Sequence, residues 1–179
     1  MKILAICGSA RKGNTEYLTK KFLEAAKNKG AETELILLRE KKIGECTGCD
    51  ICFGTQLECE IKDDMPEVTK KLLQADMIVF STPVYFDNVS GLMKVFMDRT
   101  NPLSSPPKLK GKKAFIICVG GQPIEPSIRR CEENIKNFIE IHEMELVGSF
   151  TTRAEQPVEI STKPKIIKKL QEMAMEAVK

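Results

Sequence analysis

The 179-residue sequence contains no apolar run that approaches the length of a membrane span, and its apolar start is too short for a secretory signal. Its net charge of +3 is small, and lysines and glutamates are interspersed, so the charge gives no case for nucleic-acid binding. Internal repeats and low-complexity segments are also missing. These absences lead us to expect a cytoplasmic protein that has neither a membrane nor a nucleic-acid partner.

Aromatic residues make up only 6% of the sequence, tryptophan is absent, and histidine occurs once, at His142. Because His142 lies at the expected end of a helix, we predict a surface residue that compensates the helix dipole rather than a catalytic base. Asp98 and Arg99 follow another helix, where we expect local contacts at the helix end. No side chain suggests acid–base catalysis, so we predict no catalytic residue in the chain itself.

Short apolar stretches alternate with amphipathic segments along the chain, which is typical of an α/β fold. The expected strands are 3–7, 33–38, 77–81, 113–119 and 146–150, and the expected helices include 15–29, 91–99, 163–178 and two that begin near residues 64 and 126. The strands are almost continuously apolar, as in parallel sheets covered on both faces. Right-handed crossovers and five strands favour the order 2-1-3-4-5. The length suits one domain over residues 1–179.

The loop after the first strand has the composition of an anion-binding site. Ser9 and Thr15 offer hydroxyl groups, Arg11 and Lys12 offer positive charge, and the start of a helix offers backbone amides. A terminal phosphomonoester is the anion that suits this loop best. The alternative is a strand-to-helix turn that binds nothing.

Two nucleotide-binding motifs are incomplete in this loop. Gly8, Gly13 and Thr15 are spaced as in a P-loop, but Asn14 stands where that motif requires lysine, which argues against an ATPase or GTPase. The G-x-G-x-x-G pattern of dinucleotide-binding folds is also absent.

Doubly wound sheets bind ligands beyond the carboxyl ends of their strands, where the loops 8–15, 82–89 and 120–125 are expected to converge. The second loop contains Pro83, Val84, Tyr85, Phe86 and Asp87. Its two aromatic rings offer flat surfaces, while Gly120 and Gly121 in the third loop let a planar group approach the backbone. A phosphate cradle, an aromatic wall and a bare glycine edge together predict an FMN site. Alternatively, the two aromatic rings only pack the loop.

Residues 41–62 form a longer connection than is usual between a strand and a helix, which suggests a function. They contain Cys46, Cys49, Cys52 and Cys59, spaced C-x2-C-x2-C-x6-C. Thiolates at this spacing indicate the ligands of a [4Fe–4S] cluster. A tetrahedral zinc site and a set of free or redox-active thiols are the alternatives. The other cysteines, Cys7, Cys118 and Cys131, are predicted to be core residues.

Four stretches resemble a known family: Gly8 to Thr15, the cysteine run with Asp63-Asp64-Met65, Pro83-Val84-Tyr85, and Phe96 to Thr100. They resemble the NADPH-dependent FMN reductase-like proteins of flavodoxin-like fold, and among these most of all the iron–sulfur flavoproteins. The resemblance implies that Ser9, Arg11, Asn14 and Thr15 hold the FMN phosphate. It also implies that residues 83–87 line the ribityl chain and ring, and that residues 120–121 flank the isoalloxazine.

By the same resemblance, the protein would exchange electrons between FMN and a [4Fe–4S] cluster. Its small redox partners would be ferredoxin, NAD(P)H or a quinone, with NAD(P)H considered as the electron donor. A homo-oligomer, dimer or tetramer, is implied, with residues 41–62 and 101–110 at the interface. Two other functions stay open: a cluster-free NAD(P)H-dependent FMN or quinone reductase, and a non-catalytic FMN-binding module.

Overall fold

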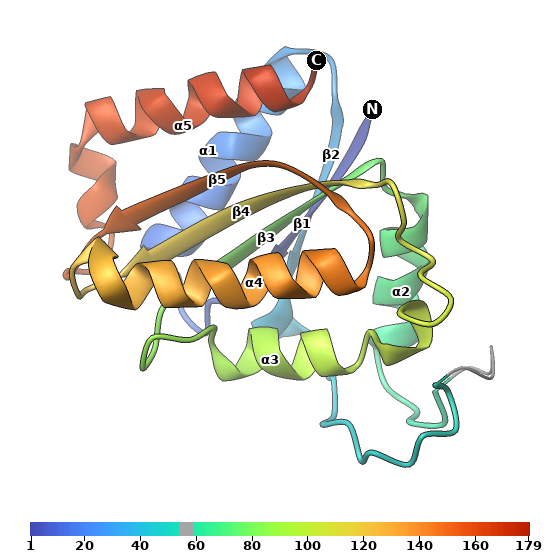
Figure 1. The fold of residues 1–179 in the computed structure, drawn as a ribbon. Helices are drawn as coiled ribbons and strands as arrows, with labels where there is room; N and C mark the ends of the chain where they lie inside the picture. The colour runs from blue at the N-terminus through green and yellow to red at the C-terminus, as the bar shows by residue number, and fades with distance from the viewer. Residues whose placement is uncertain (54–58) are drawn as a thin grey trace.

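Five parallel strands form one sheet in the order β2-β1-β3-β4-β5 (Figure 1). The structure is a computed structural model that describes residues 1–53 and 59–179. The strands are β1 (Lys2–Cys7), β2 (Glu32–Leu37), β3 (Met77–Pro83), β4 (Lys113–Gly120) and β5 (Glu145–Arg153). This confirms the predicted flavodoxin-like α/β sheet and its strand order. The cysteine-rich connection after β2 projects below α3 (Gly91–Asp98) in Figure 1.

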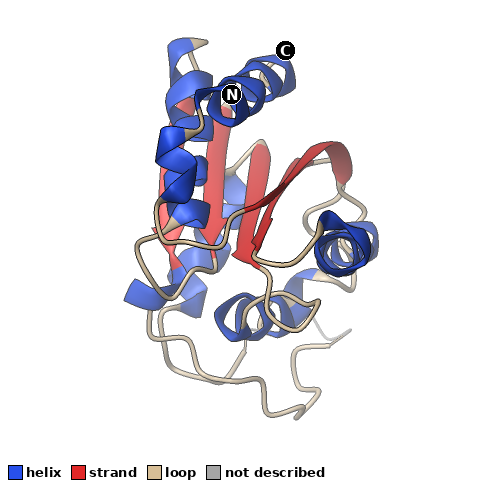
Figure 2. Cartoon of the chain, turned by 90° about the vertical axis from the view of Figure 1, so that its left-hand side faces the viewer, coloured by secondary structure: helices blue, strands red, loops and turns tan. Residues whose placement is uncertain are grey.

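Helices cover both faces of the sheet, which Figure 2 shows nearly edge-on. Two of them, α1 (Asn14–Asn28) and α5 (Pro164–Ala177), pack on one face. The other face is covered by α2 (Met65–Gln74), α3 and α4 (Arg129–Ile141). In the part of the chain that the structure describes, no helix has the length and apolar character needed to cross a membrane.

Each face of the sheet has its own apolar core because successive strand residues point in opposite directions. Along β1, Leu4 and Ile6 belong to the core under α2, α3 and α4, whereas Ile3 and Ala5 belong to the core under α1 and α5. All four side chains are at most 2% exposed. The continuous apolar run in the sequence therefore corresponds to a strand buried on both sides.

Two strands extend further than the sequence pattern indicates. The strand predicted at 146–150 spans Glu145–Arg153, because its pairing with β4 continues as far as Gly120 and Arg153. The strand predicted at 77–81 reaches Pro83, which pairs with Val119. Their carboxyl ends therefore lie together at one edge of the sheet.

Two connections also differ from the predictions. The helix expected to begin near Pro126 is preceded by a kinked segment, Ile124–Ile128, in which the Glu125 backbone is extended (φ −99°, ψ 131°), and α4 proper begins at Arg129. The prolines of residues 101–110 predict a surface excursion, yet Leu103 and Leu109 are 2% and 1% exposed. These two leucines join the core under α4, so the segment is anchored in the fold.

His142 is buried, so the prediction of a surface residue was wrong. It follows the last turn of α4 as expected, but only 2% of it is exposed. Its Nε2 atom lies 3.0 Å from the Thr100 Oγ1 atom, and its ring meets the edge of Phe138 with a centroid distance of 4.6 Å. Burial lowers the pKa of His142 below the ordinary value, so the imidazole is neutral at neutral pH and does not compensate the helix dipole.

We expect the buried imidazole to make stability depend on pH below 6.5, the ordinary pKa of histidine. Since the folded pKa is lower than the unfolded one, the stabilisation is complete above 6.5 and is lost as the pH falls through the folded pKa. The slope should reach at most about 1.4 kcal/mol per pH unit, because one proton is involved.

Urea unfolding between about pH 7 and pH 5.5 measures this slope. His142→Gln should flatten it, because the chain has no other histidine. An identical slope in the variant would contradict the assignment.

Candidate functional site

One cavity of about 500 Å³ lies at the edge where β1, β3, β4 and β5 end, a volume typical of ligand pockets. Loops that are far apart in the sequence meet there because parallel strands end on the same side. All predicted cofactor residues except Lys12 line this cavity: Ser9, Arg11, Gly13, Asn14, Thr15, Pro83, Val84, Tyr85, Phe86, Asp87, Gly120 and Gly121. Lys12 is exposed and lies outside the lining.

The start of α1 forms the anion-binding end of the cavity. Gly13 occupies the N-cap position and has no side chain with which to cap the amides of the first turn. The Ser9 hydroxyl donates to the Arg11 carbonyl at 2.7 Å, which fixes the shape of the loop. Arg11 is exposed and makes no ion pair with any residue that the structure describes. Open amides, a helix dipole and an unpaired guanidinium together favour a bound anion.

A buried carboxylate supports this loop from behind. Glu16 is 4% exposed, and its oxygens lie 2.6 Å from the Lys20 Nζ atom and 2.7 Å from the Arg39 Nη1 atom. Burial alone would raise the pKa of Glu16, but the hydrogen bonds from Lys20 and Arg39 outweigh it and lower the pKa. Arg39 also donates to the Ser9 carbonyl at 3.4 Å. The loop is thereby held in place before any ligand arrives.

Asn14 uses both ends of its side chain to hold a distant segment. Its Nδ2 atom donates to the Gln156 carbonyl at 2.8 Å, and its Oδ1 atom accepts from the Ile160 amide at 3.0 Å. The asparagine in place of a P-loop lysine thus joins the loop 8–15 to the segment after β5.

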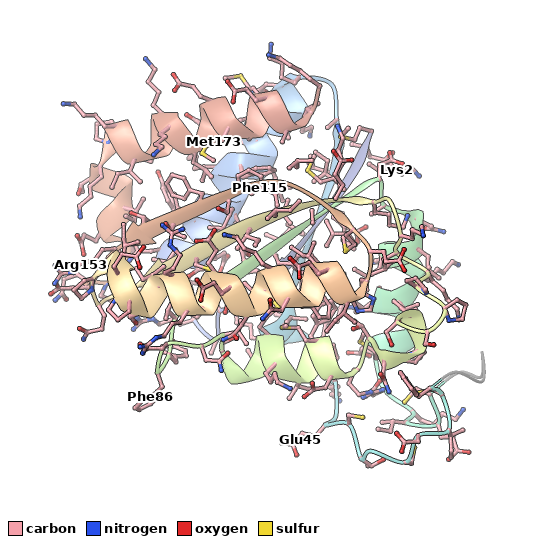
Figure 3. All side chains as sticks on the ribbon, viewed as in Figure 1. Lys2, Glu45, Phe86, Phe115, Arg153 and Met173 are labelled. Carbon is pink, nitrogen blue, oxygen red and sulfur yellow. The ribbon has the colours of Figure 1, made fainter. Side chains whose placement is uncertain are left out.

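The second predicted loop is a tight hairpin with an aromatic tip. The Tyr85 and Asn88 backbones exchange two hydrogen bonds of 3.0 Å, and the two residues between them have positive φ angles of 50° for Phe86 and 60° for Asp87. Positive φ at both central residues identifies a type I′ turn. Phe86 is fully exposed and stands away from the body in Figure 3.

Asp87 anchors this hairpin to the base of α4. Its carboxylate lies 2.7 Å from the Arg130 Nη1 atom. Hydrogen bonds from Ser127 and then Arg130 lower the pKa of Asp87. Non-glycine residues in the left-handed region cost about 1–3 kcal/mol each, and such strain is common at ligand clamps.

Glycine suits the two positions of the third loop, Gly120 and Gly121, for different physical reasons. A Cβ atom at Gly120 would lie 2.9 Å from Ile128 Cγ1 and 3.2 Å from Val84 Cβ, so packing demands glycine there. At Gly121 the nearest atom would be Glu155 Cγ, at 4.0 Å. Only Gly121 therefore leaves backbone open to a planar ligand.

The lining also contains residues that sequence reasoning missed: Val119, Gln122, Ser127, Ala154 and Glu155. Ala154 and Glu155 come from a fourth loop, the one after β5, because that strand continues to Arg153. The signal was available, since the order 2-1-3-4-5 puts the end of β5 beside that of β4. Arg153 Nε donates to the Gly121 carbonyl at 2.9 Å and joins these two ends.

The thiols of the cysteine-rich connection are neighbours, but the described residues contain no group of three or more side chains in a metal-binding arrangement. Cys46 and Cys49 are exposed, Cys59 is half-buried and Cys52 is buried. Burial raises the pKa of Cys52, and Cys59, Cys49 and Cys46 raise it further, so all of them lie within electrostatic range. Residues 54–58 of this connection lie outside the described part of the chain.

The remaining cysteines are core residues, as predicted. Cys7, Cys118 and Cys131 are fully buried. Cys118 on β4 and Cys131 on α4 have their sulfur atoms 3.9 Å apart.

Arg99 does not make the local contacts that were predicted for it. Asp98 does, since it pairs with Lys94 one turn earlier on α3. Arg99 is 2% exposed and pairs with Asp63, 36 residues away, while its Nη1 atom donates to the Gly44 carbonyl at 2.8 Å. Both partners flank the cysteine run.

Comparison with known proteins agrees with this geometry. Residues 1–157 match the family model of the NADPH-dependent FMN reductases. An iron–sulfur flavoprotein of Methanocaldococcus jannaschii is 40% identical over 154 residues, which cover 83% of this chain and 76% of the relative. An iron–sulfur flavoprotein of Methanosarcina thermophila is 34% identical over 150 residues, 83% of this chain and 78% of the relative.

Among solved structures, an NAD(P)H:quinone oxidoreductase from Methanothermobacter marburgensis has a similar fold, with a TM-score of 0.80. The match covers 98% of this chain and 95% of that one, at 12% sequence identity. At this identity the similarity supports the fold alone.

We expect Asn14→Ala to lower the free energy of unfolding by about 1–3 kcal/mol, because the buried Ile160 amide loses its side-chain acceptor. Urea unfolding measures the loss, and faster hydrogen exchange at Ile160 would locate it. The matched control is Asn28→Ala at the exposed end of α1, with an expected change within about 0.5 kcal/mol. Equal stability of the two variants would contradict the bridging role.

Proposed function

The chain belongs to the NADPH-dependent FMN reductase family, and on that premise we propose that it transfers electrons between FMN and a [4Fe–4S] cluster. It is a flavin-dependent oxidoreductase of the iron–sulfur flavoprotein group. The observation that carries the proposal is the cavity of about 500 Å³ that unites an open helix N-terminus, an aromatic hairpin and a bare glycine. We further propose that residues 1–179 act as one FMN-binding domain.

The donors at the start of α1 fit the phosphate group of FMN. The uncapped amides of the first turn, the Thr15 hydroxyl and the unpaired Arg11 would bind it. Ser9 and Asn14 would act indirectly, since Ser9 is bonded to the Arg11 backbone and Asn14 to Gln156 and Ile160. Their part is to hold the loop in its binding shape.

The opposite side of the cavity fits the isoalloxazine ring. Gly121 offers open backbone, and Tyr85, which is 45% exposed, would gain burial beside a flat ligand, as would Phe86. When bound, FMN supplies the redox chemistry, because a flavin accepts two electrons and passes them on singly. The residues of the chain bind and orient it, and we propose no acid or base among them.

The donor set of the cysteine run fits an iron–sulfur cluster. Cys46, Cys49, Cys52 and Cys59 can each supply a thiolate, the ligand that such clusters take. The ion pair of Arg99 with Asp63, which follows Cys59 by four residues, places a positive charge at the end of the run. When bound, the cluster supplies one-electron transfer.

A cluster-free NAD(P)H-dependent FMN or quinone reductase is the second candidate function. The exposure of Cys46 and Cys49, and the lack of a metal-binding arrangement among the described residues, favour it. For either function we propose NAD(P)H, ferredoxin or a quinone as redox partners. We also propose a dimer or tetramer with residues 41–62 and 101–110 at the interface.

Arg11→Ala and Thr15→Val should each weaken FMN binding by about tenfold or more, because each removes a donor to a charged group. Fluorescence titration of the flavin-free protein with FMN measures the dissociation constant. Riboflavin, which lacks the phosphate, should bind both variants as well as it binds the wild type. Lys27→Ala, an exposed cation at the other end of α1, is the control. Equal losses for riboflavin and FMN would contradict the phosphate assignment.

Anaerobically prepared protein should contain iron and acid-labile sulfide in equal amounts, with a broad absorption beneath the flavin bands. Cys46→Ser and Cys59→Ser should each remove most of the iron, because a thiolate ligand is lost. Cys131→Ala changes a core cysteine and should keep the wild-type iron content.

Iron and sulfide at background in the wild type would exclude the cluster, and zinc in their place would identify the metal alternative. Oxidation of NADPH with a quinone by iron-free protein would support the second candidate function.

A further inference from the structure

The two ends of the cysteine-rich connection are joined by a compact set of hydrogen bonds. The Asp64 amide donates a hydrogen bond to the Lys42 carbonyl at 2.9 Å, and the Lys42 amide donates to Asp64 Oδ2 at 2.7 Å. Asp63 accepts from the amides of Gly44 and Met65, both at 2.9 Å. Figure 3 shows Glu45, just after this closure, where the connection leaves the body of the protein.

Arg99 fastens this closure to α3. Its Nη1 atom donates to the Gly44 carbonyl at 2.8 Å, and its Nη2 atom lies 3.2 Å from Asp63 Oδ1. The side chains of Arg99 and Asp63 are 1% and 9% exposed. One guanidinium group thus contacts the chain on both sides of the cysteine run, before Cys46 and after Cys59.

The pairing with Asp63 leaves part of the guanidinium unused. The Nε atom of Arg99 is buried and has no hydrogen-bond partner among the described residues. A buried donor without an acceptor is costly, so an arginine with a purely structural role would be expected to satisfy it. The Nε donor is therefore available to the sulfur of a cluster-ligand thiolate.

Cys59 is half-buried and precedes Asp63, the ion-pair partner of Arg99, by four residues. Burial would lower the pKa of Arg99, but the Asp63 carboxylate raises it, and Cys59 raises it further. As a cluster ligand, the Cys59 thiolate would carry a negative charge and could accept a hydrogen bond. The Arg99 guanidinium is always protonated, so it could supply both the donor and the opposite charge. Hydrogen bonds and charges around ligand sulfurs set the potentials of iron–sulfur clusters.

We propose that Arg99 is a positioning residue that sets the reduction potential of the cluster by hydrogen bonding and charge at the Cys59 ligand. The inference rests on the proposed function, because it requires the cluster. On reduction the cluster gains one electron from the flavin, and no bond forms or breaks at Arg99. The guanidinium keeps its protons, and its positive charge stabilises the more negative reduced state.

The test is a redox titration of the holoprotein with variants that move the charge in opposite directions. Arg99→Gln removes the cation, so the ratio of reduced to oxidised cluster at a fixed potential should fall by about tenfold, which is 59 mV for a one-electron couple. Asp63→Asn removes the competing anion and should shift the potential upward. Arg99→Lys keeps the charge without Nε and should fall between the wild type and Arg99→Gln.

Lys70→Gln is the matched control, because Lys70 is an exposed cation on α2 and its loss changes the net charge equally. Its potential should match the wild type. Iron, sulfide and FMN content are measured on every variant, together with the urea unfolding of the metal-free protein. A merely structural role would change stability but would not shift the potential in opposite directions at Arg99 and Asp63.

If the wild type contains no cluster, the proposed function fails and this inference fails with it. If the cluster is present and Arg99→Gln retains the wild-type potential, only the role of Arg99 is overturned. Loss of iron from Arg99→Gln with unchanged stability of the metal-free chain supports positioning. If Arg99→Gln loses both iron and that stability, the double variant Arg99→Gln/Asp63→Asn decides, because it leaves no unpaired buried charge. Loss of iron from a stable double variant supports positioning. Full iron content in a stable double variant assigns Arg99 to the fold and overturns the inference.

Discussion

The parallel register of β1, β3, β4 and β5 is the constraint on which the site depends. Cys7 of β1 pairs with Ser81 of β3, and Ser81 pairs with Ile117 of β4, so these three strands end close together. The pairing of Gly120 with Arg153 places the end of β5 beside them. Hydrogen bonds between buried hydroxyl groups and the strand ends stabilise this edge of the sheet. Thr19 Oγ1 lies 2.8 Å from Ser81 Oγ, and the Ser90 hydroxyl donates to the Gly8 carbonyl at 2.6 Å.

These hydroxyl contacts connect helices to strand ends. Ser90 caps α3 by accepting from the Met93 amide at 3.2 Å, while its hydroxyl donates to Gly8 at the end of β1. A Cβ atom at Gly8 would approach Ser90 Oγ to 2.8 Å, so the glycine is required by packing. The loop after β1 therefore has its shape because two helices and a strand meet around it.

Most of the fold and three of the four site loops follow from the sequence because they depend on local pattern. Continuous apolar runs identify buried parallel strands, and parallel strands fix which loops meet. The contributions of Ala154 and Glu155 were missed because the end of β5 depends on its pairing with β4, not on its own half-exposed residues. Partners such as Asn14 and Ile160, separated by 146 residues, leave no periodic signal. The same holds for Arg99, whose position at a helix end suggested a local contact.

The two halves of the proposed machinery differ in how their geometry is determined. The cavity proposed for FMN is formed by strand ends and helix caps that the apolar cores already hold in place, so its lining is organised by the fold. Among the described residues, the ends of the cysteine run are held by the closure at Gly44 and Asp63 and by the ion pair with Arg99, where removing one partner of a buried pair costs about 3–5 kcal/mol. Beyond that closure, metal binding itself would supply the energy that orders the thiols. Flavin affinity and cluster assembly should therefore respond to different substitutions, since the first depends on the sheet edge and the second on the clamp that Arg99 provides.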